Sequence, residues 1–416
     1  MVSVPSPSET ATSVAYRPEL YSAPATRITS VDLLRGLVMV IMALDHTREY
    51  FTNTNFSPED LAHTSGAMFF TRFVTHFCAP VFSLLAGTGA FLAVSRGKTV
   101  QEVSRFFWTR GIWLVFLELT FIGFGWTFFM PFGFAGVIWI LGWSMVAMAV
   151  IVRLPVRWIA VLGVVMIVGH NLLDGISPDS FGKFSWLWMF LHSPGMYWIK
   201  EPTRYLYFTY PFIPWVGVMA SGYAMGALLQ RPDRKKLFFR IGIGMTLAFF
   251  VLRGINLYGN GTAGLPPSVG LWSVQPTLTL SVISFFNTLK YPPSLDYLLM
   301  TLGPALIALA WFDGVKAERG LGRVLLVFGR VPMFYYVLHI YLIHIMAIVV
   351  ALLIHQPSAF LWSWDFILQP LPDGYGHGLP FIYLMWICVP LILYVPCRRY
   401  MEFKRQHREW RWLSYL

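Results

Sequence analysis

A histidine surrounded by charged residues lies at the end of the first long apolar segment, which runs from about residue 28 to 46. Ionisable side chains are costly at the boundary of a membrane-spanning helix, so their presence there favours a functional role. His46 follows Asp45 and is followed by Arg48 and Glu49. An imidazole held by a carboxylate in a low-dielectric site can act as a general base or as a transient nucleophile. His46 is therefore the leading catalytic candidate.

Helical spacing decides which carboxylate can hold the His46 ring. On a continuing helix, Asp45 and His46 point about 100° apart and cannot pair. Glu49 lies three residues further on and can reach the ring, whereas Asp45 can meet Arg48. We expect Glu49 to be the partner of His46, and Asp45 to replace it only if the helix ends there. The plainer alternative is an interfacial histidine bonded to a loop carbonyl.

Two further pairs of polar residues share a helix face. Asp32 and Arg35, three residues apart in the first turns of the same segment, can form an ion pair. Arg72 and His76, four apart in the second segment, imply a polar cavity or a partner inside the membrane, with an interhelical hydrogen bond as the alternative.

Candidate acceptor-binding residues lie later in the chain. Arg253 and Asn256, three apart at the end of the seventh segment, can hold a carboxylate, phosphate or sugar, although a snorkelling arginine is as plausible. Lys290 precedes Tyr291 in a following loop. His339 lies near the middle of the ninth segment, four residues after Tyr335 and therefore on the same face.

The sequence lacks the residue spacings that are typical of metal ligands. It contains no His-Glu-x-x-His motif and no Cys/His cluster, and His344 points away from His339 because it is five residues further on. The three cysteines, Cys78, Cys388 and Cys397, suggest no disulfide framework. We predict no metal.

The elements that must position these residues are predicted from composition. Hydrophobic residues make up 56% of the 416 residues and charged residues only 12%, against about a quarter in soluble domains. The apolar segments predict an all-α, polytopic transmembrane helix bundle of about ten spans. These are roughly 28–46, 67–94, 105–125, 132–152, 157–170, 209–229, 238–257, 294–312, 324–350 and 379–397. Residues 27–397 form one membrane domain, between a disordered tail (1–26) and a basic tail (398–416).

The positive charge is concentrated in alternate loops. Of the 31 lysines and arginines, 24 fall in the tails, the start of the first span and the loops on one side of the predicted spans. This asymmetry is the positive-inside rule, so both termini are predicted to be cytoplasmic. The net charge of +11 therefore reflects topology and not nucleic-acid binding, with a basic groove for an anionic cytosolic ligand as a second interpretation.

The predicted outer side carries most histidines and the long loops 171–208, 258–293 and 354–378. Long loops often cover or carry functional sites, so we expect the chemistry near the outer face.

Several motifs resemble one known group. The chain has Arg-Ile-x-Ser-x-Asp-x-Leu-Arg-Gly-Leu from Arg27, Asp45-His46-x-Arg48, Arg72-Phe-Val-Thr-His-Phe-Cys-Ala-Pro-Val-Phe, Tyr210-Pro-Phe-Ile-Pro-Trp and Phe328-Gly-Arg-Val-Pro-Met-Phe. From about residue 27 to 397, it resembles bacterial membrane proteins related to heparan-alpha-glucosaminide N-acetyltransferase.

The resemblance implies a transmembrane acyltransferase that moves an acetyl group from cytosolic acetyl-CoA to a glucosamine amine on the far side, using an outer-face histidine. The wider clan has an arginine near the start of the first span and a histidine near its end, as Arg35 and His46 do here. In the heparan enzyme the catalytic histidine lies in the following loop, where this chain has His63. His46 is preferred because its neighbours are charged at helical spacing.

The sequence therefore predicts an inner-membrane acyltransferase with a glycan or sugar acceptor. Arg35 helps to admit acetyl-CoA, while Arg48, Arg72, His76, Arg253, Asn256, Lys290 and His339 line the substrate site. A proton-coupled transporter or flippase and a non-catalytic sensor are the rivals. Homo-oligomerisation is left open.

Overall fold

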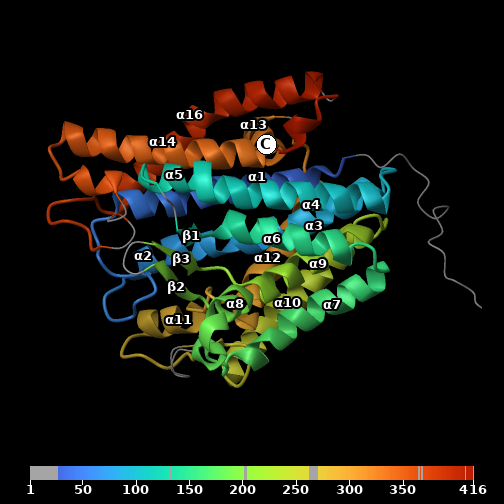
Figure 1. Cartoon of the computed structure of the whole chain (residues 1–416), viewed down its shortest axis with the longest axis horizontal. Coiled ribbons are helices and arrows are strands. Elements are labelled where there is room, and N and C mark those ends of the chain that lie inside the picture. The colour runs from blue at the N-terminus through green and yellow to red at the C-terminus, as the bar shows by residue number, and fades with distance from the viewer. Residues whose placement is uncertain are drawn as a thin grey trace, which may run out of the picture.

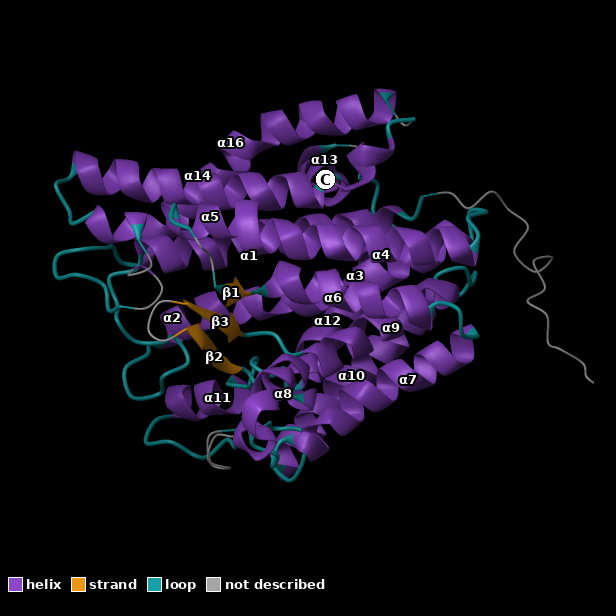
Figure 2. Ribbon diagram, in the orientation of Figure 1, coloured by secondary structure: helices purple, strands orange, loops and turns teal. Residues whose placement is uncertain are grey.

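The computed structural model describes residues 27–130, 133–200, 204–261, 270–317, 319–363, 366, 369–407 and 409–415. The predicted tail 1–26 lies outside these residues. Long helices run side by side along the longest axis of the molecule, and three short strands cluster near one end of the bundle (Figures 1 and 2).

Helices make up most of the described chain. The α-helices are α1 (Thr29–Phe51), α2 (Gly66–Phe73), α3 (Cys78–Val94), α4 (Val100–Leu117), α5 (Gly123–Thr127), α6 (Val137–Ile151), α7 (Val156–Gly169), α8 (Ser185–Leu191), α9 (Phe212–Leu228), α10 (Arg234–Ile255), α11 (Leu278–Phe286), α12 (Leu295–Phe312), α13 (Gly320–Arg330), α14 (Pro332–Leu353) and α16 (Leu379–Gln406). The short 3-10 helices are η2 (Val74–Phe77), η4 (His170–Leu173), η5 (Pro178–Phe184), η7 (Ala359–Trp362) and η8 (Arg411–Tyr415), and η3 (Glu118–Ile122) is a π-helix.

Each of the ten predicted segments coincides with at least one helix. Among the described residues, seven helical stretches are long and apolar enough to cross a membrane: Gly66–Val94, Val100–Thr127, Val156–Leu173, Arg234–Ile255, Leu295–Phe312, Pro332–Leu353 and Leu379–Gln406. Helices α6 and α9 are apolar but shorter. Helix α1 has the length of a span but carries charged residues at both ends. The chain is therefore a multi-pass membrane protein.

One predicted span is not continuous in the structure. The segment 324–350 is two helices, because α13 ends at Arg330 and α14 begins at Pro332. Proline has no N–H to donate and its ring clashes with the preceding turn, so it starts a helix readily but interrupts one. Amphipathic α13 therefore packs beside α1 as a separate element.

The strands form a small sheet that the sequence analysis did not predict. The strands β1 (Phe134–Ala135), β2 (Gly195–Lys200) and β3 (Arg204–Phe208) have the order β1-β3-β2. Strand β3 is parallel to β1 and antiparallel to β2, with Phe134 opposite Tyr207 and Gly195 opposite Phe208. The sheet gives part of the long 171–208 loop an ordered structure.

Glycines allow two helix pairs to approach closely. A Cβ added at Gly87 of α3 would lie 1.9 Å from the Met219 carbonyl oxygen of α9, and one at Gly36 of α1 would lie 1.9 Å from the Leu325 carbonyl oxygen of α13. Small residues at such contacts let membrane helices pack backbone to backbone. Helix α1 is thereby held firmly between its neighbours.

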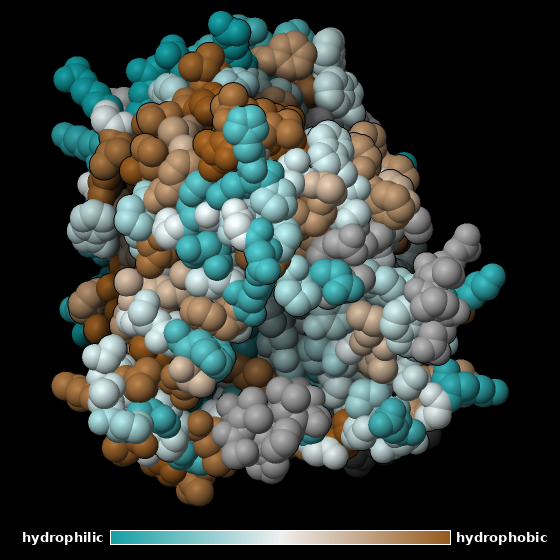
Figure 3. Space-filling view, turned by 90° about the vertical axis from the view of Figure 1, so that its left-hand side faces the viewer, coloured by the Kyte–Doolittle hydropathy of each residue, from teal (hydrophilic) through white to brown (hydrophobic). Residues whose placement is uncertain are grey.

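The two ends of the bundle differ. The start of α1 and the end of α16 lie at the same end (Figure 1). At the opposite end, polar residues are interspersed with apolar ones on the face (Figure 3). The loop 52–65 and α2 lie at this second end (Figure 1).

Candidate active site

Helix α1 continues past His46 to Phe51, so Asp45 and His46 point in different directions. The Asp45 carboxylate instead pairs with Arg48, whose Nη2 lies 3.1 Å from Oδ1. Its other oxygen accepts a hydrogen bond from Arg72. The Asp45–Arg48 contact expected from helical spacing is confirmed.

Arg72 and His76 do share a face, and both contact a residue that sequence reasoning missed. Arg72 Nε donates to Glu59 Oε1 at 3.0 Å, and His76 Nε2 lies 3.4 Å from the same oxygen. Glu59 belongs to the loop that follows α1. This loop is thereby tied to the helices at the end of the bundle that carries α2.

The electrostatic effect of these contacts is visible on Glu59. Burial alone would raise the pKa of Glu59, but the Arg72 guanidinium and the hydrogen bond with His76 outweigh burial and hold this pKa well below its usual range. Glu59 is therefore a carboxylate at neutral pH, and Arg72 lies between two carboxylates, those of Asp45 and Glu59.

The structure gives His46 a different partner from the one that the sequence predicted. Its Nδ1 lies 2.7 Å from Nε2 of His339 in α14, and the two rings stack with centroids 4.9 Å apart. The Glu49 carboxylate lies 3.6 Å from Arg48 Nη2, and among the described residues no hydrogen bond joins Glu49 to His46. Helical spacing allowed a Glu49 contact, but packing of α14 against α1 brought a better-placed acceptor to the ring.

The hydrogen-bond chain fixes which nitrogen of His46 is free. His339 Nδ1 lies 3.2 Å from the carbonyl oxygen of Tyr335, which can only accept, so this nitrogen carries the proton. Neutral His339 then has a lone pair on Nε2 and accepts from His46 Nδ1–H. We assign the remaining lone pair of neutral His46 to Nε2.

Aromatic rings surround the histidine pair. Trp126 packs edge-on against His46 with centroids 4.8 Å apart, and Tyr336 lies 6.3 Å from His46 and 5.3 Å from His339. Trp126 and Tyr336 were not predicted, because one aromatic residue among many carries no sequence signal. Together they shape a half-buried, largely apolar site around the imidazole.

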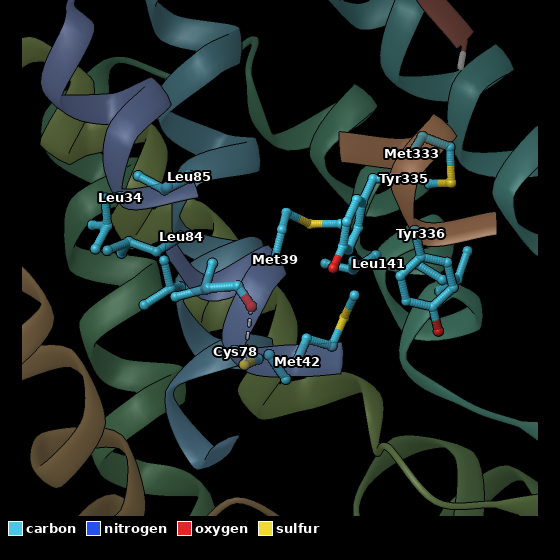
Figure 4. Close-up of a cluster of buried hydrophobic side chains, with 14 of the residues drawn as sticks. Leu34, Met39, Met42, Cys78, Leu84, Leu85, Leu141, Met333, Tyr335 and Tyr336 are labelled. Carbon is cyan, nitrogen blue, oxygen red and sulfur yellow. Dashed lines mark hydrogen bonds between the residues drawn. The ribbon is translucent and has the colours of Figure 1, made fainter. Parts of the chain in front are cut away.

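A cavity of about 380 Å³ has Tyr336, the neighbour of both histidines, in its wall, whereas His46 and His339 are not among its lining residues. Tyr336 lines it, and so do apolar residues from α1, α3, α6 and α14, several of which are drawn in Figure 4: Met39, Leu85, Leu141 and Met333. Its cationic lining residues are Arg35, Lys98 and Arg110. The cavity therefore combines a mainly apolar wall with a set of positive charges.

Arg35 is held in place at the cavity. Its Nη1 lies 3.3 Å from Asp32 Oδ1 and 3.0 Å from the Gly329 carbonyl oxygen of α13. The predicted Asp32–Arg35 pair is confirmed, and it has a second cation in Arg27, whose Nη2 is 3.0 Å from Asp32 Oδ1. Positive charge therefore gathers where α1 begins, eleven residues before His46.

His63 lies apart from this arrangement. Its side chain is 64% exposed, and Nδ1 lies 2.6 Å from Asp60 Oδ2 in the same loop. The hydrogen bond from His63 lowers the pKa of Asp60. Among the described residues, His63 has no hydrogen bond to Asp45, Arg72 or His339.

Arg253 and Asn256 do not join the site either. Arg253 is fully buried, and its five N–H groups make five hydrogen bonds, to Asn260 and to the carbonyls of Gly270, Ser284, Phe285 and Asn287. Asn256 follows α10 in the left-handed conformation. Its Nδ2 donates to the Trp272 carbonyl, and its Oδ1 accepts from the Trp272 N–H. No N–H group of Arg253 remains to bind a substrate. The structure therefore gives Arg253 a structural role in place of the predicted role in acceptor binding.

Lys290 lies in the loop before α12 and is buried, with its ammonium 5.1 Å from the centre of the Tyr291 ring. It adds positive charge near Asp45 and His46. Lys290, Arg48 and Arg72 therefore surround the end of α1 with three cations.

These features define a multi-pass membrane protein with a histidine pair that packs against Tyr336, which lines a cavity with cationic residues. A family model described as heparan-alpha-glucosaminide N-acetyltransferase, catalytic, matches residues 27–257, more than half of the chain. The chain belongs to this family. The matched range includes His46 and Arg72 but ends before Lys290 and His339. None of the curated proteins compared with the chain matches it.

Proposed function

We propose that the protein is an acetyltransferase that moves the acetyl group of acetyl-CoA to an amine or hydroxyl of a sugar acceptor. The observation that carries this proposal is the His46–His339 pair, which leaves His46 Nε2 with a free lone pair and packs against Tyr336, a residue of the cavity wall. Family membership supports the reaction class.

The cavity suits the donor chemically. Small-molecule sites commonly have volumes of about 300–1,000 Å³ with mainly apolar walls, and this one has about 380 Å³. Arg35, Lys98 and Arg110 match the phosphates of CoA in charge, and the apolar wall suits its thioester arm. In this arrangement the phosphates stay near the start of α1 and the acetyl group points toward Tyr336.

In the proposed reaction, His46 Nε2 removes the proton from the acceptor amine or hydroxyl. The acceptor nitrogen or oxygen forms a bond to the thioester carbonyl carbon, and the carbon–sulfur bond breaks to release the CoA thiolate. The proton on His46 then passes to that thiolate, so the imidazole returns to its neutral form. A transient acetyl-imidazole on His46 is the second route, in which His46 attacks the thioester before the acceptor does.

Nearby residues support the developing charges. The Tyr336 hydroxyl makes no hydrogen bond to another side or main chain in the described part of the protein and is proposed to donate to the thioester oxyanion. Arg48, Arg72 and Lys290 are proposed to orient the acceptor. Asp45 and Glu59 are proposed to hold the two arginines, and His76 to hold Glu59.

The orientation in the membrane is part of the proposal. We place the start of α1 and the end of α16 in the cytoplasm, where acetyl-CoA is available, and the loop 52–65 on the extracytoplasmic side of a bacterial inner membrane. Helices α1, α6 and α9 then complete about ten crossings within one domain, residues 27–397.

The direct test is acetyl transfer by the purified protein in liposomes, with radiolabelled acetyl-CoA and a panel of glucosamine-containing acceptors. We expect His46→Ala to lower kcat by about 10²–10⁴-fold, the usual contribution of a general base. His63→Ala is the matched control and keeps the activity. If His63→Ala abolishes transfer while His46→Ala retains it, the assignment is overturned.

The same experiment separates the rival functions. A transporter or flippase would move the acceptor across the bilayer without attaching labelled acetyl to it. A sensor would bind acetyl-CoA and form no product. Mass spectrometry of cell-envelope glycans from cells with and without the protein would then identify the acceptor through a lost acetyl mark.

A further inference from the structure

Three buried side chains outside the histidine pair meet at one point. His170 belongs to η4, Asp174 follows this helix, and His192 follows α8. Their exposed fractions are 1%, 8% and 0%, respectively. One ring nitrogen from each histidine and one carboxylate oxygen all lie within 4.8 Å of one another.

The two histidines carry polar atoms that the protein leaves unsatisfied. Neither ring nitrogen of His170 makes a hydrogen bond to another described residue, although the Pro293 carbonyl is near the ring. His192 Nδ1 is also buried without a hydrogen bond to any described residue. Buried polar atoms are rarely left in this state, because their lost hydration is uncompensated.

Asp174 is oriented by a neighbouring amide. Asn171 Nδ2 lies 3.0 Å from Asp174 Oδ2, which turns Oδ1 toward His192 Nε2 at 3.1 Å. Asn171 Oδ1 in turn accepts from the Leu295 backbone N–H at the start of α12, at 3.0 Å. Outer-shell hydrogen bonds of this kind hold metal-binding carboxylates in position.

The separation of the donor atoms suits a metal ion. With metal bonds of about 2.0–2.1 Å, neighbouring ligands of a tetrahedral zinc ion lie about 3.3 Å apart. The Asp174–His192 contact is already close to that value, and a ring nitrogen of His170 lies within 4.8 Å of both donors. Two imidazoles and one carboxylate are donors that zinc prefers, whereas Ca²⁺ and Mg²⁺ prefer oxygen ligands alone.

We propose that His170, Asp174 and His192 bind one Zn²⁺ ion. The ion joins η4 to the end of α8 and, through Asn171, to the start of α12. It therefore stabilises the long loop that carries β2 and β3. This site is separate from His46 and does not depend on acetyl transfer. The proposed zinc site replaces the prediction of no metal, because that prediction was based on ligand motifs within short stretches of the sequence.

The test is the metal content of the full-length protein purified in detergent. We expect about one zinc per chain by elemental mass spectrometry, and less than a tenth of that in Asp174→Asn and in His170→Gln. The matched control is His63→Gln, which changes the exposed His63–Asp60 pair. This variant should keep the zinc content of wild type. Replacement by Co²⁺ should give the visible absorption bands of a low-symmetry cobalt site, absent from Asp174→Asn.

A measurement on the unmodified protein keeps the proposal testable if a variant fails to fold. Chelator-treated wild type should regain thermal stability with stoichiometric Zn²⁺ and not with Mg²⁺. The proposal is overturned if wild type holds no zinc and gains no stability from it, or if Asp174→Asn and His170→Gln bind as much zinc as wild type.

Discussion

The pairing of two histidines from distant helices makes a specific prediction for His339→Phe. Phenylalanine keeps a planar ring against His46 and Tyr336 but removes the nitrogen that accepts from His46 Nδ1. Without this acceptor the His46 ring is free to rotate, and the proton is free to occupy Nε2, which cannot then act as a base.

The size of the effect follows from the lost contact. One hydrogen bond contributes about 0.5–1.5 kcal/mol. Since a tenfold change in rate is about 1.4 kcal/mol, we expect kcat to fall by about 2–12-fold in His339→Phe. The KM for acetyl-CoA should be unchanged because the cations of the cavity are intact.

The assay is steady-state acetyl transfer in liposomes, with both kcat and KM determined. His63→Phe is the control, since it removes an exposed imidazole from the same protein. Thermal unfolding of each variant in detergent separates loss of activity from loss of folding. A folded His339→Phe protein with wild-type kcat would show that the histidine pair does not orient the base.

Three other changes test other parts of the structure. Arg110→Gln should raise the KM for acetyl-CoA about tenfold while leaving kcat and the KM for the acceptor unchanged; an equal rise in the acceptor KM contradicts a donor site. Arg253→Met should destabilise the protein by about 3 kcal/mol or more because five buried acceptors lose their donor, which thermal unfolding measures; normal stability with weaker acceptor binding would restore the binding role. The Glu59 pKa is lowered by Arg72 and His76 against the effect of burial, so its contribution is complete above about pH 4.5 and is lost as the pH falls through the lower folded pKa. The protection of residues 53–65 against hydrogen exchange, measured relative to the intrinsic rate at each pH, should therefore fall in acid. In Glu59→Gln it should already be low at neutral pH; protection that is independent of pH in wild type argues against this.

The sequence predicted contacts within helices better than contacts between them. Asp45 with Arg48, and Asp32 with Arg35, followed from helical spacing alone. His339 was selected because a histidine is costly inside a span, but its pairing with His46 joins residues 293 positions apart. Spacing along one helix cannot reveal which helix packs beside it.

Other differences also have physical causes. The short strands β1 and β3 pair through backbone groups of residues far apart in the sequence, so local patterns did not reveal them. Pro332 was a visible signal for the division between α13 and α14, but the surrounding apolar run obscured it. Arg253 was assigned a binding role because its carbonyl partners, Gly270 and three residues at the end of α11, lie 17 to 34 positions further along the chain, beyond the reach of helical spacing.

The firm packing of α1 has a consequence for the length of the substrate. Arg35 and His46 lie on one uninterrupted helix, and eleven residues at 1.5 Å each separate them by about 16 Å along its axis. The glycine contact with α13 fixes this helix, so in the proposed reaction the distance between Arg35, which binds the donor, and the reactive nitrogen of His46 is constant. Under that proposal a donor must span the distance to engage both, and a short activated acetyl compound such as acetyl phosphate is expected to reach either end but not both.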